Sequence, residues 1–205
     1  MTHTVVFREF QERDIDFVYQ CKNDEKLNRM IVRQNGSFSR EDAARWVHGC
    51  MGEHEEYKFW AVCTNDEEQR IVGWISLSNI DNINSSACFH GIVIGDKDYN
   101  DGFAWIESYL FIMDYVFVVL GLNRLYGSSI IGNIDSNNAA NVFLWTKEGV
   151  KRQAIFRDGH FYDVKMSSIL REEYLSNLSK GEYELKPILH RVRMCQGKLN
   201  HMSVE

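Results

Sequence analysis

The stretch SACFHGIVIGDKDYNDGFAWIES, residues 86–108, decides the fold. Residues 86–95 are mainly apolar and predict a strand. After the loop, an apolar stripe at helical spacing predicts a helix that ends at Gly121. The stripe consists of Ile106, Tyr109, Leu110, Met113, Phe117 and Leu120. A loop between a strand and a helix can bind a phosphate through the first N–H groups of the helix; an ordinary helix start, capped by Asn100 or Asp101, explains the same residues.

The elements on either side of this stretch predict one mixed fold. Before it, the sequence predicts strands at 4–10, 57–64 and 70–80 and helices at 12–30 and 39–51. After it, the sequence predicts a strand at 123–131, a helix at 137–149 and a hairpin at 150–170. The order β-α-α-β-β-β-α-β-α-β-β indicates an α/β (α+β) chain with a mixed, mostly antiparallel central sheet flanked by helices.

The two N-terminal helices carry signals of their own. Ile15, Val18 and Tyr19, with Lys22 as a further candidate, fall on one face of the stretch 12–30, and this spacing predicts the first helix. Ser39 is followed three residues later by Asp42, and this pair predicts a capping box at the start of the second helix.

Composition excludes some classes of function. The chain has 205 residues, a formal net charge of −6 and no basic stretch that alternates with aromatic residues. This argues against nucleic-acid binding, whereas an acidic surface favours a cationic partner such as an amine. No run of 18 apolar residues and no signal-peptide pattern occurs, so we expect no membrane association and a cytoplasmic protein.

The cysteines indicate neither a disulfide framework nor a metal site. There are five of them, an odd number, and no pair has CxxC spacing. We therefore expect reduced thiols in the core and no bound metal. Cys88 has no basic neighbour in sequence that would activate a thiol nucleophile.

The order of elements resembles the GNAT superfamily of acyl-CoA-dependent N-acyltransferases, in particular its branch that acetylates ribosomal-protein N-termini, polyamines and amino sugars. That branch carries an Arg/Gln-x-x-Gly-x-Gly/Ala signature directly after a central strand. YNDGFA, residues 99–104, occupies this place here. Gly102 and Ala104 match the signature, whereas Tyr99 and Asp101 depart from it.

Two further stretches carry the resemblance. NAANVFLWTKEGV, residues 138–150, is similar to a family pattern of Asn-x-x-Ala/Ser followed by a helix that ends in Lys-x-Gly-Phe. Its matching residues are Asn138, Asn141, Lys147 and Gly149. FRDGHFYDVKMSSILREEY, residues 156–174, looks like the closing hairpin of the branch. The resemblance implies an acyltransferase-like domain at 1–174 and leaves 175–205 as a C-terminal tail, helix or loop.

The resemblance also implies an activity and a set of binding residues. The activity is transfer of an acetyl group from acetyl-CoA, as co-substrate, to a primary amine of a small molecule or a protein N-terminus, by direct attack in a ternary complex. The implied coenzyme contacts are Ile92, Val93, Ile94, Asn100, Asp101, Gly102, Phe103, Ala104, Asn138, Asn141, Trp145 and Lys147.

His90 is the candidate general base. It lies on the central strand two residues before Ile92, and imidazole titrates near neutrality, as general-base work requires. A buried structural histidine is the alternative. Trp145 stands where the family often has a tyrosine that serves as the acid; it packs either against the coenzyme or in the core. Glu107, one turn into the helix, is expected on a solvated face.

Two other functions stay open at this point. The first is a catalytically degenerate acyltransferase-like domain that binds acyl-CoA or a protein partner. The second is an interaction module in which the C-terminal tail binds a partner or a second copy, so that a homodimer is not excluded. The identity of the amine does not follow from the sequence.

Overall fold

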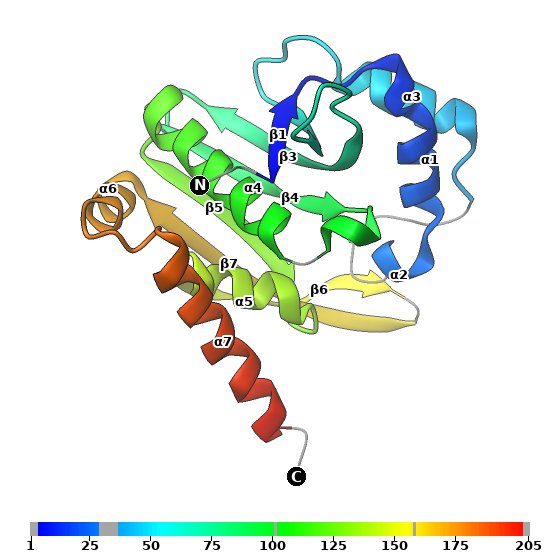
Figure 1. Ribbon diagram of the computed structural model, residues 1–205. Coiled ribbons are helices and arrows are strands. Elements are labelled where there is room, and N and C mark those ends of the chain that lie inside the picture. Colours follow the sequence, from blue (N-terminus) through cyan, green and yellow to red (C-terminus); the bar gives the residue numbers. More distant parts are fainter. Residues whose placement is uncertain (1–3, 29–36, 101, 158, 203–205) are drawn as a thin grey trace. The chain divides into compact units, whose positions relative to one another are not determined.

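The computed structural model describes residues 4–28, 37–100, 102–157 and 159–202. They form two compact units, residues 1–112 and 113–205 (Figure 1). The predicted fold class is confirmed, because each unit combines helices with strands that pair antiparallel.

The first unit contains four strands in the order β1-β2-β3-β4. Their bounds are Val5–Arg8, Lys58–Thr64, Ile71–Asp81 and Ser86–Ile94. Its α-helices are α1 (Ile15–Asn23), α2 (Glu25–Asn28), α3 (Arg40–Cys50) and the first three turns of α4 (Phe103–Asp114). Short 3-10 turns occupy Glu12–Asp14 and Lys97–Tyr99. The predicted strands and the hairpin of β2 and β3 are confirmed.

The two faces of this four-stranded sheet are covered by different helices (Figure 1). On one face, Trp74 and Ala61 pack in a core with Val18 of α1 and Val47 of α3. On the other face, Phe111 of α4 stacks on Phe7 and meets Trp60 edge-on; these ring centroids lie 4.0 and 5.3 Å apart from that of Phe111. Alternation along the strands therefore sends neighbouring side chains to different sets of helices.

The predicted helix at 12–30 is interrupted. The helix breaks at Asp24, whose extended backbone ends α1 and whose carboxylate accepts from Lys26 N and Leu27 N, so that a new helix starts. Val18 is fully buried, whereas Tyr19 is 39% exposed. Cys21 takes its place at the core.

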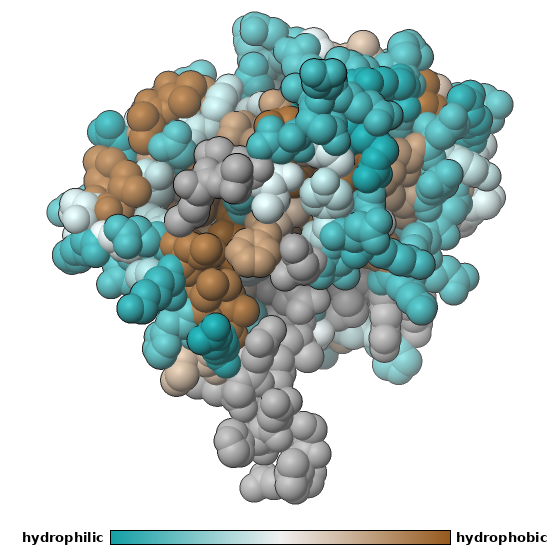
Figure 2. Space-filling view, in the orientation of Figure 1, coloured by the Kyte–Doolittle hydropathy of each residue, from teal (hydrophilic) through white to brown (hydrophobic). Residues whose placement is uncertain are grey.

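The predicted start of α3 is confirmed. Ser39 Oγ accepts from Asp42 N at 3.1 Å, and Ser39 N donates to the Asp42 carboxylate at 3.0 Å. This reciprocal pair is the capping box read from the sequence. The outer surface over α1 and α3 is mainly hydrophilic (Figure 2), as expected of helices that bury one face only.

The second unit has three strands in the order β5-β7-β6. Their bounds are Arg124–Ile130 for β5, Thr146–Arg157 for β6 and His160–Leu170 for β7. Its helices are α5 (Ile134–Val142), α6 (Arg171–Ser179) and α7 (Leu185–Met202), preceded by residues 113–114 of α4 and a π-helical segment, Tyr115–Val119. Gly121 follows at φ +66°, which fits the predicted helix end.

The predicted helix at 137–149 was wrong at both ends. Helix α5 starts at Ile134 and ends at Val142. Leu144 has a φ of +61°, and Trp145 N donates to Ala140 O at 2.7 Å, which closes the helix. Lys147 and Gly149 consequently lie in strand β6 and pair with β7.

Helix α7 and the turn before it pack on α5. Arg191 Nε of α7 donates to Val142 O at 2.6 Å, and Tyr183 OH donates to Phe143 O at 3.4 Å. These donors satisfy carbonyls at the end of α5 that have no partner within the helix. Ile188 of α7 is fully buried. The predicted division at residue 174 falls inside α6 and stays a prediction.

Candidate functional site

Strand β4 carries an extra residue at the candidate base. Gly91 pairs with Ser76 and Phe89 pairs with Leu77, so His90 has no opposite residue on β3 and forms a β-bulge. Gly91 has a φ of +130°, a conformation that favours glycine. A bulge redirects the side chain it carries. His90 is exposed, so the alternative of a buried structural histidine was wrong.

The three residues after the bulge lie in a tight part of the sheet. Ile92, Val93 and Ile94 are half-buried and pair with Ile75, Trp74 and Gly73 of β3. A Cβ on Gly73 would lie only 2.2 Å from Val93 O, so glycine is required for this close approach. Val93 packs in the core beneath α1 and α3, and alternation sends its two neighbours toward the opposite face.

Hydrogen bonds fix the start of the loop after β4. Gly95 N and Asp96 N both donate to Val72 O, at 2.9 and 3.2 Å. The Asp96 carboxylate accepts from Asp98 N at 3.0 Å and from Arg70 Nη1 at 2.5 Å. Burial alone would raise the pKa of Asp96, but these hydrogen bonds outweigh it and hold the pKa below its ordinary value. The turn is thereby fixed in place.

Helix α4 starts at the glycine of the signature. Gly102 has a φ of +93°, nothing lies within 4 Å of the Cβ position, and its carbonyl accepts from Ile106 N at 3.0 Å. Ala104 is buried, whereas Asn100 and Phe103 are exposed. Asp101 lies outside the described residues. An open glycine at the start of a twelve-residue helix fits a diphosphate, which helix N–H groups and the helix dipole attract.

Glu107 has a structural role that the sequence did not reveal. Its carboxylate accepts hydrogen bonds from Thr4 N, Thr4 Oγ1 and Val5 N, each at 3.0 Å. The expectation of a merely solvated side chain was therefore wrong. Glu107 joins the first turns of α4 to the start of β1.

In the second unit, the start of α5 adds a candidate that was not predicted from the sequence. Asn133 is the N-cap, and its side chain accepts from Ser136 N at 3.1 Å. Asn133 and Ser136 form the Asn-x-x-Ser pattern that the family resemblance placed five residues later. Asn138 is half-buried and Asn141 is exposed. Their coenzyme contacts stay predictions.

Asn137 fastens the start of α5 to the strand before it. Its amide donates to Ile130 O at 3.1 Å, to Ile131 O at 2.8 Å and to Asn133 O at 2.7 Å. Its carbonyl accepts from Ser129 Oγ at 3.2 Å. The amide thus has a structural role within this unit.

The end of α5 carries no hydroxyl at the family's acid position. Trp145 is 9% exposed, which agrees with its alternative as a core aromatic; its contact with the coenzyme stays a prediction. The acid position can also be measured from Leu144, whose positive φ ends the helix. The residue four positions before Leu144 is Ala140. Lys147 is exposed on β6. Neither of these two positions, Trp145 or Ala140, therefore holds a tyrosine that could serve as the acid.

The described residues contain neither a candidate membrane span nor a candidate metal site. Within the described part of the chain, no helix is both long and apolar enough to cross a membrane. In the same residues, no group of three or more His, Cys, Asp or Glu side chains could hold a metal ion.

The chain matches a known protein family. The family model "Acetyltransferase (GNAT) domain" matches residues 4–150. The chain belongs to the GNAT acetyltransferase family. This confirms the predicted family, the enzyme class of N-acetyltransferase and acetyl-CoA as the co-substrate.

Relatives of this GNAT chain include two bacterial proteins. The uncharacterized N-acetyltransferase p20 of Bacillus licheniformis is 25% identical over 175 residues, covering 84% of this chain and 96% of the relative. The uncharacterized N-acetyltransferase YoaA of Bacillus subtilis is 24% identical over 172 residues, covering 83% of this chain and 95% of the relative.

A solved structure supports the fold. The spermidine N-acetyltransferase of Vibrio cholerae, in complex with CoA and spermine, aligns with a TM-score of 0.73 at 22% identity. The alignment covers 84% of this chain and 98% of the Vibrio protein. At this identity the likeness shows the fold.

Proposed function

We propose that the chain transfers the acetyl group of acetyl-CoA to a primary amine, of a small molecule or a protein N-terminus, by direct attack in a ternary complex. One observation about the first unit carries the proposal. Strand β4 carries a bulge, and the loop that follows β4 leads to Gly102, an open glycine at the start of α4. The end of a strand and the start of a helix in this order offer main-chain groups to an extended thioester and a diphosphate.

The first unit supplies the binding groups. The main chain at 100–104 would hold the diphosphate, and the main chain at 92–94 would hold the pantetheine arm. The fixed turn at Asp96 and the close packing at Gly73 keep both segments in place before the substrate arrives. Such preorganisation lowers the entropy lost on binding.

The reaction requires a neutral amine. The amine nitrogen forms a bond to the acetyl carbon, the carbon–sulfur bond breaks, and the electron pair leaves on the thiolate. His90 would accept the proton from the amine, and the bulge presents its exposed imidazole away from the regular pleat. Main-chain N–H groups of β4 would polarise the carbonyl.

Neither Trp145 nor Ala140 offers a hydroxyl, so the leaving thiolate would take its proton from solvent or from another side chain, or would leave without an acid. This same observation favours a second candidate function, a domain that binds acetyl-CoA without transferring the acetyl group. The acceptor is of the amine class, as spermine is for the Vibrio structure named above.

Calorimetry with acetyl-CoA and a thiol-release assay over a panel of amines test the proposal together. Saturable binding with amine-dependent thiol release supports acetyl transfer. Binding without release supports the second candidate. If acetyl-CoA does not bind, both functions are rejected and an interaction module remains.

A further inference from the structure

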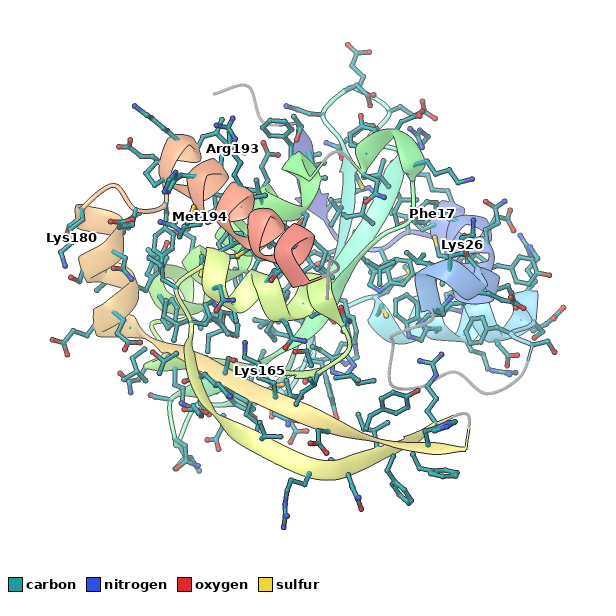
Figure 3. The ribbon with its side chains drawn as sticks, turned by 90° about the horizontal axis from the view of Figure 1, so that it is seen from below. Phe17, Lys26, Lys165, Lys180, Arg193 and Met194 are labelled. Carbon is teal, nitrogen blue, oxygen red and sulfur yellow. The ribbon has the colours of Figure 1, made fainter. Side chains whose placement is uncertain are left out.

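The hairpin of β6 and β7 continues beyond the third strand of its sheet. The last residue of β5, Ile130, pairs with Val164, so residues 160–162 of β7 pair within this unit with β6 alone. Figure 3 shows the two strands as a long curved ribbon, on which Lys165 is labelled. We call the outer part of this hairpin, residues 151–157 and 159–162, the arm.

A bulge fixes the direction in which the arm leaves the sheet. Residues 152–154 of β6 lie opposite Asp163 of β7, so three residues on one strand face one on the other. Gln153 has a φ of +51°, and its main-chain N–H donates to Asp163 Oδ1 at 2.7 Å. A bulge bends and twists the strand that carries it. The arm is therefore held in a defined orientation on its own sheet.

Two phenylalanines lie side by side on the arm. Phe156 is the cross-strand partner of Phe161, and their ring centroids are 4.8 Å apart. Their side chains are 64% and 61% exposed. A two-stranded ribbon has no core in which to bury such rings, and neighbouring exposed aromatic side chains are typical of an interface. The pair is thus a candidate contact for another molecule.

The charge of the arm restricts what that molecule can be. Residues 151–162 contain three basic side chains and one acidic side chain, and Lys151 is exposed. Two arms from two copies of the chain would repel each other, because like charges would meet. The surface that covers Phe156 and Phe161 should instead combine apolar area with negative charge.

A loop of the first unit has this chemistry. Residues 52–57, between α3 and β2, carry three exposed carboxylates, those of Glu53, Glu55 and Glu56. Tyr57 is 43% exposed, and its ring meets the ring of His54 edge-on with centroids 6.5 Å apart. The main chain of the loop is attached to β3, because Glu56 O accepts from Ile80 N at 3.2 Å. We call residues 52–57 the acidic loop.

We propose that the partner of the arm is a second copy of this chain, and that the arm of each copy contacts the acidic loop of the other in a two-fold dimer. Phe156 and Phe161 would pack against Tyr57, and Lys151 would face the glutamates. Both surfaces are exposed in one chain, and a two-fold dimer forms the same contact twice. The inference does not depend on the proposed acetyl transfer.

Sedimentation equilibrium of the full chain tests the dimer. The wild type should dimerise with a Kd of about 1–100 µM and more weakly as the ionic strength rises from about 0.1 to 1 M. Phe156→Ser together with Phe161→Ser should raise the Kd at least about thirtyfold, the loss typical of a central aromatic contact. Val119→Ser is the matched control, since Val119 is also 64% exposed, and it should leave the Kd unchanged.

Reversing charges in the acidic loop tests the other side of the contact. Glu55→Lys together with Glu56→Lys should raise the Kd at least about tenfold, because the loop would then repel the arm. Glu67→Lys reverses an exposed charge in another turn of the same unit and should leave the Kd unchanged. All of these side chains are exposed, so circular dichroism should show folded proteins.

A mixture of the two variants tests whether arm and loop contact each other. The variant without the phenylalanines has an intact acidic loop, and the variant with the reversed loop has an intact arm. Together they can form one arm–loop contact, whereas either variant alone can form none. The mixture should therefore contain dimers at about 1 mM chain, where each variant alone stays monomeric.

Four results would overturn the inference. The first is a wild type that stays monomeric at about 1 mM chain. The second is a dimer whose Kd is unchanged by loss of both phenylalanines. The third is a mixture of the two variants that dimerises no better than each variant alone. The fourth is a monomer that binds polyglutamate through the arm, which would assign the arm to a different acidic partner.

Discussion

The carboxylate of Glu107, on α4, accepts a hydrogen bond of 3.0 Å from the main-chain N–H of Val5, at the start of β1. Thr4 donates two further hydrogen bonds to the same carboxylate, one from its main-chain N–H and one from its hydroxyl. The two segments lie 102 residues apart in sequence, so this contact forms only when the first unit is assembled.

Replacing Glu107 with Gln should therefore lower the stability of the first unit. The amide keeps one acceptor but loses the charge, and hydrogen bonds to charged groups contribute about 1.5–3 kcal/mol. Thermal unfolding of Glu107→Gln should show a lower Tm than the wild type. Glu67→Gln, at an exposed turn position, serves as the control and should not shift it.

The glycine at the start of α4 can be tested against a strained glycine elsewhere. Gly102→Val should weaken acetyl-CoA binding at least about tenfold, because a side chain would enter the open approach to the main chain. The φ of +93° adds a conformational cost of about 1–3 kcal/mol. Gly121→Val, also at positive φ and with open space around it, should lose stability without losing affinity. Equal affinities for wild type and Gly102→Val would exclude the loop as the diphosphate site.

The role of His90 as a base predicts a specific kinetic change. His90→Ala should lower kcat by roughly 10²–10⁴-fold and leave the Kd for acetyl-CoA nearly unchanged. His48, exposed on α3 with its Nε2 atom 2.6 Å from the Glu12 carboxylate, provides the matched control, and His48→Ala should retain full kcat. A loss of less than about threefold in His90→Ala would leave this residue no part in proton transfer.

The regular parts of the fold could be predicted from local sequence, whereas the details of the site could not. Runs of apolar, β-branched and aromatic residues located the strands, and the Ser39–Asp42 spacing located a cap, because both signals lie within a few residues. The bulge at His90 depends instead on its register against β3, to which no local pattern points.

The second unit shows the same limit. Its helix at 137–149 was expected to end at Gly149, but the chain turns at Leu144, a non-glycine residue with a φ of +61°. A leucine in the sequence does not predict a positive φ, which non-glycine residues rarely adopt. The Asn-x-x-Ser pattern at Asn133 and Ser136 is local, so it could be predicted from the sequence alone.

Asn133 offers a test of whether the pattern at Asn133 or the one at Asn138 contacts the coenzyme. Asn133→Asp preserves a good N-cap, so the Tm should stay within about 1 °C of the wild type. It adds a negative charge at the helix start, and if this end of α5 contacts the coenzyme phosphates, the affinity for acetyl-CoA should fall about two- to tenfold. Asn138→Asp and Asn141→Asp should have the smaller effects. The opposite ranking would favour the later pattern.

The turn after β4 should be sensitive to acid. The pKa of Asp96 lies below its ordinary value, so its ion pair with Arg70 contributes stability above the unfolded pKa of about 4 and loses it as the pH falls through the lower folded value. Arg70→Met should thus lower the Tm by about 2–4 °C at pH 7, and the difference from the wild type should shrink near pH 3. Arg152→Met, an exposed control, should show no such pH-dependent difference.

The hydrogen bond from Arg191 to Val142 O bears on how the chain is synthesised. Translation delivers α5 about 50 residues before the arginine that closes its C-terminal end. Until residue 191 has left the ribosomal exit tunnel, the second unit has its helix without the donor and without the buried Ile188. The first unit is complete much earlier. The nascent chain should therefore acquire its two units at separate moments, and a ribosome stalled before residue 191 should display a folded first unit beside a protease-sensitive second one.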